Sequence, residues 1–309
     1  MAQMLSEIQK ALLKELTGVA DFAKGAFNIR ANGASAGRQS TETIRVEPKK
    51  DGTGLDIHIA PGTRDDHVRI PVVMTESGLK EEVFNDFHVG EGAEVTIVAG
   101  CGIHNCGCDD SQHDGIHRFF IGRGARVKYV EKHVGQGDGT GRRILNPVTE
   151  VHQEEDSVLE MEMSQLRGVD ATERTTTAEL KAGARLAVRE RLLTGGAERA
   201  VSRYEVRLDG AGAVADIISR GVARDDSLQR LDLKIVGNAP CRGHTECDSI
   251  IMDRGHIVAV PTLEAANVDA ELVHEAAIGK IAGDQLDKLM SLGLTPAEAE
   301  ARIIEGFLS

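Results

Sequence analysis

Gly92-Ala-Glu-Val-Thr-Ile97 is the stretch that decides the fold, because it returns in altered form along the chain. The other copies are Gly124-Ala-Arg-Val-Lys-Tyr129, Asp156-Ser-Val-Leu-Glu-Met161, Gly183-Ala-Arg-Leu-Ala-Val188 and Gly212-Ala-Val-Ala-Asp-Ile217. Their starting points lie 27 to 32 residues apart. A turn followed by an alternating strand at such a period is typical of the coils of a β-solenoid. An antiparallel β-sandwich is the alternative, but its turns usually recur about every 8–12 residues without a longer repeat.

Helical patterns lie on both sides of this repeat. Apolar residues at helical spacing predict an amphipathic helix over residues 4–17, within an N-terminal segment of residues 1–25: they are Leu5, Ile8, Leu12 and Leu16. Short alternating runs such as Thr43-Ile-Arg-Val46 predict strands, so we expect residues 26–262 to form the β core.

Residues 263–309 are expected to form a small C-terminal helical domain. Apolar residues from Leu272 to Leu289 predict one or two helices over residues 269–290. Thr295-Pro-Ala-Glu298 combines an N-cap, a proline at the first helical position and a capping glutamate, which predicts the start of the last helix. Such a unit either caps the exposed end of a solenoid or offers a surface to a partner.

The composition excludes several classes of protein. The chain has 309 residues, of which 41% are hydrophobic, and a mean hydropathy of −0.21. No run approaches the roughly 18 apolar residues of a spanning helix, and Met1-Ala-Gln-Met-Leu-Ser-Glu7 lacks the features of a signal peptide, so we expect a cytoplasmic protein. A net charge of −13 argues against a nucleic-acid partner. Five cysteines in a cytoplasmic chain favour reduced thiols over disulfides.

Thiol, imidazole and carboxylate gather in one part of the sequence. Cys241-Arg-Gly-His-Thr-Glu-Cys247-Asp-Ser is followed by Gly255-His256 and by Leu272-Val-His274-Glu275-Ala. Cysteine, histidine and glutamate together supply the ligands of iron–sulfur and zinc sites. The alternative is structural: Cys247 is then a small buried hydrophobic residue and His256 a hydrogen-bonded core histidine.

These residues carry a family resemblance. The segment from Cys241 to Ser309 resembles the C-terminal part of the SufB/SufD family, the scaffold proteins of the Suf iron–sulfur cluster assembly system. Its further elements are Pro261, Gly279-Lys-Ile-Ala-Gly-Asp-Gln285-Leu and Ile304-Glu-Gly-Phe-Leu308. Weaker similarity extends back through Ile144-Leu-Asn-Pro-Val-Thr149 and residues 214–226. Compared with the family, the N-terminal region is short.

The resemblance implies a fold and a set of ligands. It implies a right-handed parallel β-helix flanked by short helical segments. Cys247 matches the cluster-forming thiol of SufB-type members, whereas His256, five residues before Pro261, matches a histidine of SufD-type members. Glu275 matches a functional carboxylate and is preceded by His274, but Val273 replaces the first glutamate of the family's Glu-His-Glu-Ala pattern. We expect Cys247 and His256, on successive strands, to share a sheet face.

The resemblance also implies partners. It implies docking of a SufC-like ABC-type ATPase on residues 263–309 and a sulfur donor of the cysteine-desulfurase type. Because the SufB-type thiol and the SufD-type histidine occur in one chain, we expect a homodimer joined through the terminal coils of the β-helix. The iron–sulfur cluster would be bound transiently, and no nucleic acid or membrane is expected to take part.

A second dense group of ligands spans residues 101–117. It holds Cys101, His104, Cys106 and Cys108, followed by His113 and His117. A zinc or iron site is chemically possible there. The single residue between Cys106 and Cys108 differs from the Cys-x2-Cys of a closed zinc knuckle, and an exposed loop without a metal is the alternative. We therefore expect an auxiliary role.

Gly135-Gln-Gly-Asp-Gly-Thr-Gly141 is glycine-rich but lacks the Gly-Lys-Ser/Thr of a phosphate loop, which predicts a flexible turn. ATP hydrolysis would then come from a partner. The expected function is a non-enzymatic scaffold for iron–sulfur cluster assembly. The alternatives are a β-helical carbohydrate-active enzyme, which an aromatic content of 3% argues against, and a purely structural solenoid.

Overall fold

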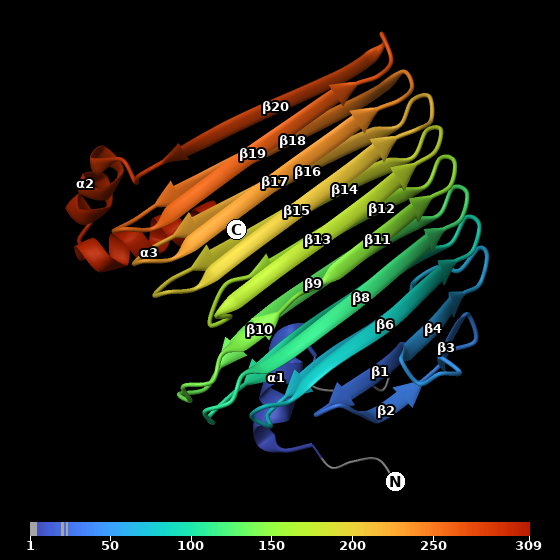
Figure 1. Ribbon diagram of the computed structural model, residues 1–309, viewed down its shortest axis with the longest axis horizontal. Helices are drawn as coiled ribbons and strands as arrows, with labels where there is room; N and C mark the ends of the chain where they lie inside the picture. Colours follow the sequence, from blue (N-terminus) through green and yellow to red (C-terminus); the bar gives the residue numbers. More distant parts are fainter. Residues whose placement is uncertain (1–4, 20–21, 23) are drawn as a thin grey trace.

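A computed structural model describes residues 5–19, 22 and 24–309 of the chain. It is a parallel β-solenoid of about eight turns with 57% of its residues in strands, which confirms the predicted fold class. Each coil gives one strand to each of two ten-stranded sheets that face each other across the core (Figure 1). We call the sheet that contains β1 sheet 1 and the sheet that contains β3 sheet 2.

The strands alternate between the two sheets along the chain. In spatial order, sheet 1 contains β2 (Ala34–Gln39), β1 (Ala26–Ala31), β5 (Asp66–Met74), β7 (Glu94–His104), β9 (Arg126–Gln136), β12 (Val158–Gln165), β14 (Arg185–Thr194), β16 (Val214–Ala223), β18 (Cys241–Ile251) and β20 (Ala270–Gly279). In the same sense, sheet 2 contains β3 (Ile44–Pro48), β4 (Gly54–Ile59), β6 (Lys80–Val89), β8 (Ser111–Ile121), β10 (Arg143–Leu145) with β11 (Val148–Gln153), β13 (Ala171–Leu180), β15 (Arg199–Leu208), β17 (Leu228–Gly237) and β19 (His256–Ala265). All pairs are parallel except β1 with β2 and β3 with β4.

The repeated turns explain why the chain coils. Gly92, Gly124, Gly183 and Gly212 all have φ between 62° and 74°, and Asp156 takes the same left-handed conformation at 57°. The residue after each of them is alanine or serine and is fully buried. Neighbouring turns are hydrogen-bonded to one another, as from Gly92 N to the Arg123 carbonyl at 2.8 Å. One left-handed residue and one small inward residue therefore start each coil of sheet 1 from β7 to β16.

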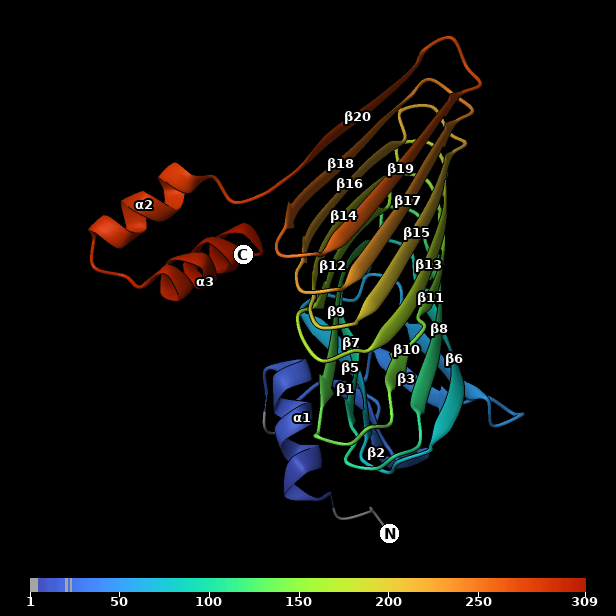
Figure 2. The same ribbon diagram turned by 60° about the vertical axis from the view of Figure 1, so that its left-hand side comes forward.

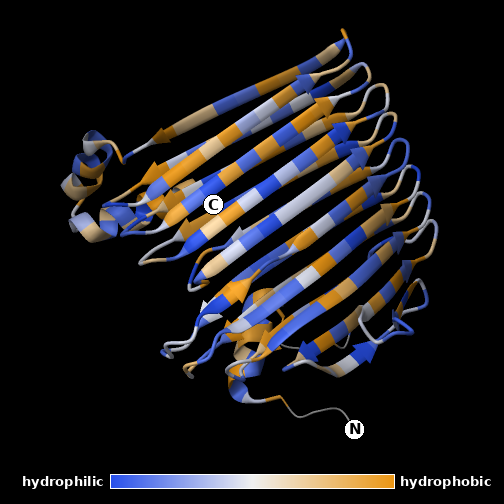
Figure 3. Cartoon of the chain, in the orientation of Figure 1, coloured by the Kyte–Doolittle hydropathy of each residue, from blue (hydrophilic) through white to orange (hydrophobic). Residues whose placement is uncertain are grey.

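Hydrophobic and hydrophilic residues alternate along many strands (Figure 3), and buried residues alternate with more exposed ones in the middle coils, as in β12 to β15. The core is built from aliphatic residues of both sheets, with Phe87, Phe119 and Tyr129 as its largest buried side chains near one end. No helix within the described ranges is long and apolar enough to cross a membrane.

The N-terminal helix α1 (Glu7–Thr17) forms as predicted, although Met4 lies outside the described residues. Ser6 and Gln9 make a capping box at its start. Leu12, Leu13 and Leu16 are buried against Val73 and Val134, so the helix covers part of sheet 1 (Figure 2).

The C-terminal region differs from expectation. The helix predicted from residue 269 is wrong in its first part, because Ala270–Gly279 is strand β20 and pairs in parallel with β18. Helix α2 (Gly283–Ser291) follows, and α3 (Pro296–Phe307) begins at the predicted Thr295 capping box. Helix α2 stands away from the coils (Figure 2), whereas the end of α3 reaches β16, where Arg220 lies over the Phe307 ring and donates a hydrogen bond to its carbonyl at 3.4 Å. The solenoid thus runs past the expected boundary at residue 262 and ends in the edge strands β19 and β20.

Candidate functional site

The pairing of β18 with β20 divides the candidate ligands between two faces of sheet 1. Thr245 lies opposite His274 in the register, and Glu246 lies opposite Glu275. Because neighbours in a parallel sheet point to the same side, the odd-numbered residues of β18 and His274 face the core. His244, Glu246 and Glu275 face outward. The predicted pair of His274 and Glu275 is therefore split between the inside and the outside of the last coils.

Cys247 is one of two inward thiols of β18, the other being Cys241 at the start of the strand. The exposed fraction of Cys247 is 1%, and it lies beside a small cavity lined by Glu190, Ser219 and Gln229. Burial, with a smaller contribution from Glu190 and Asp248, raises the pKa of Cys247 to about 12. The thiol is therefore protonated at neutral pH in the closed coil. A cation at this site, or an opening of the terminal coil, would favour the thiolate that binds metals.

His274 lies on the same inner face as the thiol, two residues before Ala276, the register partner of Cys247. Its Nδ1 is 2.7 Å from the hydroxyl oxygen of Thr245. Burial, and next to it the charge of His244, lowers the pKa of His274. A neutral imidazole is the form that binds metal ions. Cys247 and His274 therefore supply one thiol and one imidazole to the same inner face.

The outward group is a three-residue cluster with metal-ligand chemistry. Ligand atoms of His244, Glu246 and Glu275 all lie within 4.8 Å of one another. His244 Nδ1 is 2.8 Å from one carboxylate oxygen of Asp216. The other oxygen of Asp216 accepts a hydrogen bond from Arg189 at 2.6 Å. Such a carboxylate fixes the imidazole ring so that its other nitrogen is presented outward. Burial, and after it Asp248, raises the pKa of Glu246.

His256 does not join this group within one chain. It is the first residue of β19, is exposed, and lies opposite Leu228 in sheet 2. Cys247 belongs to sheet 1 and faces the core. The expectation that the two side chains share a sheet face is therefore wrong, because successive strands of a solenoid enter different sheets.

A column of buried polar side chains extends inward from Cys247. Ser202, Tyr204 and Ser219 donate hydrogen bonds to the carboxylate of Glu190, at 2.7, 2.9 and 2.8 Å. On its other side, Glu190 lies 3.6 Å from the guanidinium of Arg174. The inward positions of a solenoid coil are usually apolar, so this column of polar residues is distinct from the apolar core around it.

The column continues beyond Arg174. Arg174 donates a hydrogen bond of 2.6 Å to Glu131, which accepts another from Tyr129 at 3.1 Å. His117 Nδ1 is 2.8 Å from the Tyr129 hydroxyl oxygen, and His133 lies 3.5 Å from Glu131. Burial alone would raise the pKa of Glu131, but Arg174 and the neighbouring imidazoles hold it well below the usual range. Burial lowers the pKa of His117 to about 4.

The structure separates the residues of the 101–117 group. Cys101, His113 and His117 face the interior and line a second small cavity with Glu131 and His133. His104 ends β7, and Cys106 and Cys108 lie exposed in the loop that follows. His104 Nε2 is 3.0 Å from the sulfur of Cys106. Two of the three buried thiols, Cys101 and Cys247, thus lie at opposite ends of the polar column.

Sequence reasoning missed the roles of His244 and Glu246 and the whole polar column. The spacing of His244-Thr-Glu246 is that of two residues on one strand face, which is a usable signal. The position of Glu275 beside them depends on the register of β18 with β20, and the sequence pattern around Glu275 had indicated a helix instead.

Known proteins of one family are similar to this chain over most of its length. The family model described as "SUF system FeS cluster assembly, SufBD core domain" matches residues 83–307. An iron–sulfur cluster assembly SufBD family protein of Archaeoglobus fulgidus is 30% identical over 276 residues, which are 88% of this chain and 72% of that protein. A relative of the same description from Methanothermobacter thermautotrophicus is 26% identical over 276 residues, which are 88% of this chain and 66% of that protein.

A more local similarity falls on part of the chain. The iron–sulfur cluster assembly protein SufB of Bacillus subtilis is 38% identical over 68 residues, which are 22% of this chain and 15% of that protein. The chain spans only about two thirds of the length of the Methanothermobacter relative.

Proposed function

The chain belongs to the SufBD family of iron–sulfur cluster assembly proteins, and we propose that it is a cytoplasmic, non-enzymatic scaffold on which a cluster is built and from which it is transferred. The observation that carries this proposal is the gathering of ligands in the last two coils of sheet 1. Cys247 and His274 lie on the inner face there, and His244, Glu246 and Glu275 lie on the outer face. The cluster is the cargo of such a protein and stays only until transfer.

The two faces support two different tasks. Carboxylates and imidazole suit a ferrous ion, so the outer group is suited to receive iron. The buried thiol suits the cluster itself, since thiolate sulfur is the usual ligand of iron–sulfur clusters. The pKa of Cys247 keeps the thiol protonated until iron approaches, because metal binding releases the thiol proton.

The scaffold requires partners. His256 is exposed on an edge strand, so a second chain docked on the terminal coil would place its own His256 at this end of the solenoid, near the coil that holds Cys247. We therefore assign the site to a homodimer, with an ABC-type ATPase docked on α2 and α3 and a cysteine-desulfurase-type sulfur donor. Met290 of α2 and Leu292, the residue directly after α2, are exposed apolar residues suited to such docking. Binding of a purified ABC-type ATPase, lost when both residues are replaced by serine, tests that contact.

Anaerobic reconstitution with ferrous iron and inorganic sulfide tests the scaffold itself. Cys247→Ser is expected to lose most of the bound iron and sulfide, because the thiolate is lost while the volume barely changes. Cys241→Ser is the matched control, since Cys241 is also an inward, buried thiol of β18 but lies six positions away. Visible absorption and metal analysis provide the readout. Equal cluster content in Cys247→Ser and wild type would disprove the assignment.

A further inference from the structure

The loop of residues 104–110, which we call the dithiol loop, joins β7 to β8 and lies outside the site proposed above. It carries two exposed thiols, Cys106 and Cys108, separated by Gly107. The sulfur of Cys106 is 3.0 Å from Nε2 of His104. A thiol in contact with an imidazole is the arrangement of an activated sulfur nucleophile, because the imidazole takes up the thiol proton.

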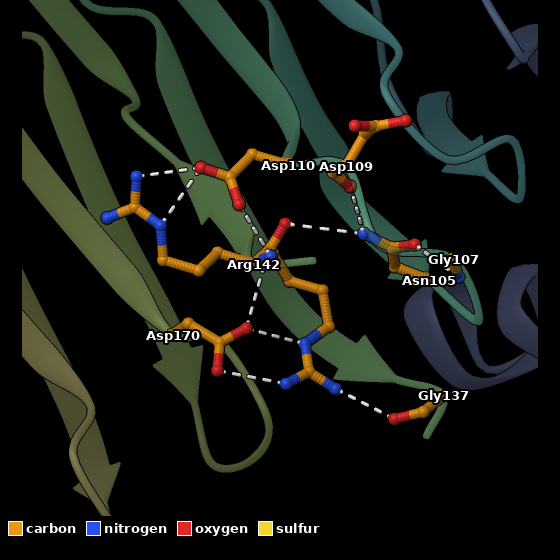
Figure 4. A network of polar contacts seen from close by, with 8 residues as sticks. Asn105, Gly107, Asp109, Asp110, Gly137, Arg142 and Asp170 are labelled. Carbon is orange, nitrogen blue, oxygen red and sulfur yellow. Dashed lines mark hydrogen bonds and ion pairs between the residues drawn. The ribbon is translucent and has the colours of Figure 1, made fainter. Parts of the chain in front are cut away.

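The dithiol loop is held in one conformation by hydrogen bonds from its own residues and its neighbours. The Asn105 side chain accepts from Gly107 N at 3.0 Å and donates to the Asp109 carbonyl at 2.8 Å. Ser77 donates to the same carbonyl at 3.0 Å. At the end of the loop, Asp110 accepts from the backbone and the guanidinium of Arg142 (Figure 4).

The glycine-rich stretch 135–141 packs against this loop. A Cβ at Gly137, Gly139 or Gly141 would lie 2.1 to 2.3 Å from backbone oxygens of Asn105, Gly107 and Asp109. Gly139 and Gly141 also donate hydrogen bonds to the loop backbone, at 3.1 and 3.0 Å. The stretch predicted as a flexible turn thus packs on a neighbouring loop and is hydrogen-bonded to it. Alternate glycines let this stretch lie directly on the loop and fix the backbone that carries the two thiols.

We propose that the dithiol loop converts the sulfane sulfur of a persulfide into sulfide. Cys106 attacks the outer sulfur of a donor persulfide, the donor S–S bond breaks, and His104 passes the Cys106 proton to the departing thiolate. The products are a Cys106 persulfide and the donor thiol. Cys108 then attacks the Cys106 sulfur, which forms the Cys106–Cys108 disulfide and releases hydrogen sulfide. The two electrons come from the two thiols, so each chain acts once until it is reduced again.

This inference rests on the proposed function, because cluster assembly consumes sulfide. The geometry favours it over a metal site at the loop. Among the described residues, the groups of three ligands within 4.8 Å are Asp56 with Asp86 and His88, and His244 with Glu246 and Glu275. The dithiol loop places only His104 and Cys106 in contact. Two exposed thiols and one imidazole therefore fit sulfur exchange better than coordination of an ion.

Anaerobic incubation of the reduced full chain with glutathione persulfide tests the proposal. The wild type and Cys241→Ser are expected to release about one sulfide per chain and to gain the 106–108 disulfide, seen by mass spectrometry of the peptide. Cys108→Ser is expected to stop at a persulfide on Cys106, and Cys106→Ser to form neither product at the loop. His104→Gln is expected to slow the first step about 100-fold.

The outcomes separate this inference from the scaffold assignment. Sulfide release by the Cys106→Ser, Cys108→Ser double variant equal to that of wild type would overturn the role of the loop. The same double variant is expected to assemble its cluster normally when inorganic sulfide is supplied. If it loses all iron under those conditions, the loop is the principal metal site and both the sulfur chemistry and the scaffold site at Cys247 are wrong.

Discussion

Arg174 is the residue that makes a charged interior possible. Its side chain is about 5% exposed and lies between two buried carboxylates, Glu131 and Glu190. Burial alone would lower the pKa of Arg174, but these neighbours outweigh it and raise the pKa instead. One guanidinium therefore provides the counter-charge for two carboxylates that are removed from water.

Arg174→Met is expected to lower the free energy of unfolding by about 3–5 kcal/mol, because it leaves both carboxylates buried without their counter-charge. Urea unfolding followed by circular dichroism measures this. Arg203→Ala is the control: Arg203 lies on the outer face of the next strand of sheet 2 and pairs with Glu173 at 3.2 Å in solvent. Its loss is expected to stay within about 0.5 kcal/mol. Similar losses in both variants would show that Arg174 contributes no more than a surface pair.

At the level of single residues, the sequence predicted the turns but not the column. Gly92 and its repeats mark positions that need a left-handed backbone, and Asp156 is recognisable as a substitute because aspartate tolerates that conformation. Glu131, Arg174 and Glu190 lie 43 and 16 residues apart in the sequence. Nothing local relates them, since their contact arises only when the coils stack.

In β20 the local sequence pattern favours a helix, whereas the tertiary pairing with β18 produces a strand. Leu272, Ala276 and Ile278 fit a helical face and also, with His274, alternate along a strand. The edge of β18 offers a row of backbone partners to this segment, and pairing with it decides the outcome. The cap of α3 was predicted because Thr295 acts within one turn of its own helix.

Glu275 of the same strand is expected to affect the rate of cluster assembly. Glu275→Gln is expected to slow cluster assembly about tenfold or more, since it removes the anionic oxygen that faces His244 and Glu246. The initial rate of absorbance growth during reconstitution measures it.

Glu271→Gln is the matched control for this strand. Glu271 lies on the same outer face of β20, four residues before Glu275, and pairs with Arg242 at 3.0 Å. Its assembly rate is expected to equal that of wild type. An unchanged rate in Glu275→Gln would exclude this carboxylate from the site.

Over the whole molecule, the two ends of the solenoid are built differently. At the N-terminal end, β2 and β3 are the edge strands of the two sheets and pair antiparallel with β1 and β4, and α1 covers the side of sheet 1. At the other end, β19 and β20 leave apolar side chains in solvent, among them Val260, Leu263 and Ile278 at 37–42% exposure. Helices α2 and α3 stand beside this end and leave it open (Figure 2). An open edge with apolar residues is a surface for association.

We expect the protein to be a homodimer in solution through this end. An isologous contact pairs the same edge strands of two chains, covers the apolar residues, and places His256 of each chain at the interface near the coil that holds Cys247. Sedimentation equilibrium is expected to give twice the chain mass for wild type, and the monomer mass for Ile278→Lys because a charge then lies in the apolar contact. Leu166→Lys is the control, since Leu166 is equally exposed at 41% but follows β12 in the middle of the solenoid. A monomeric wild type, or a dimer that only Leu166→Lys disrupts, would place the second histidine out of reach of Cys247.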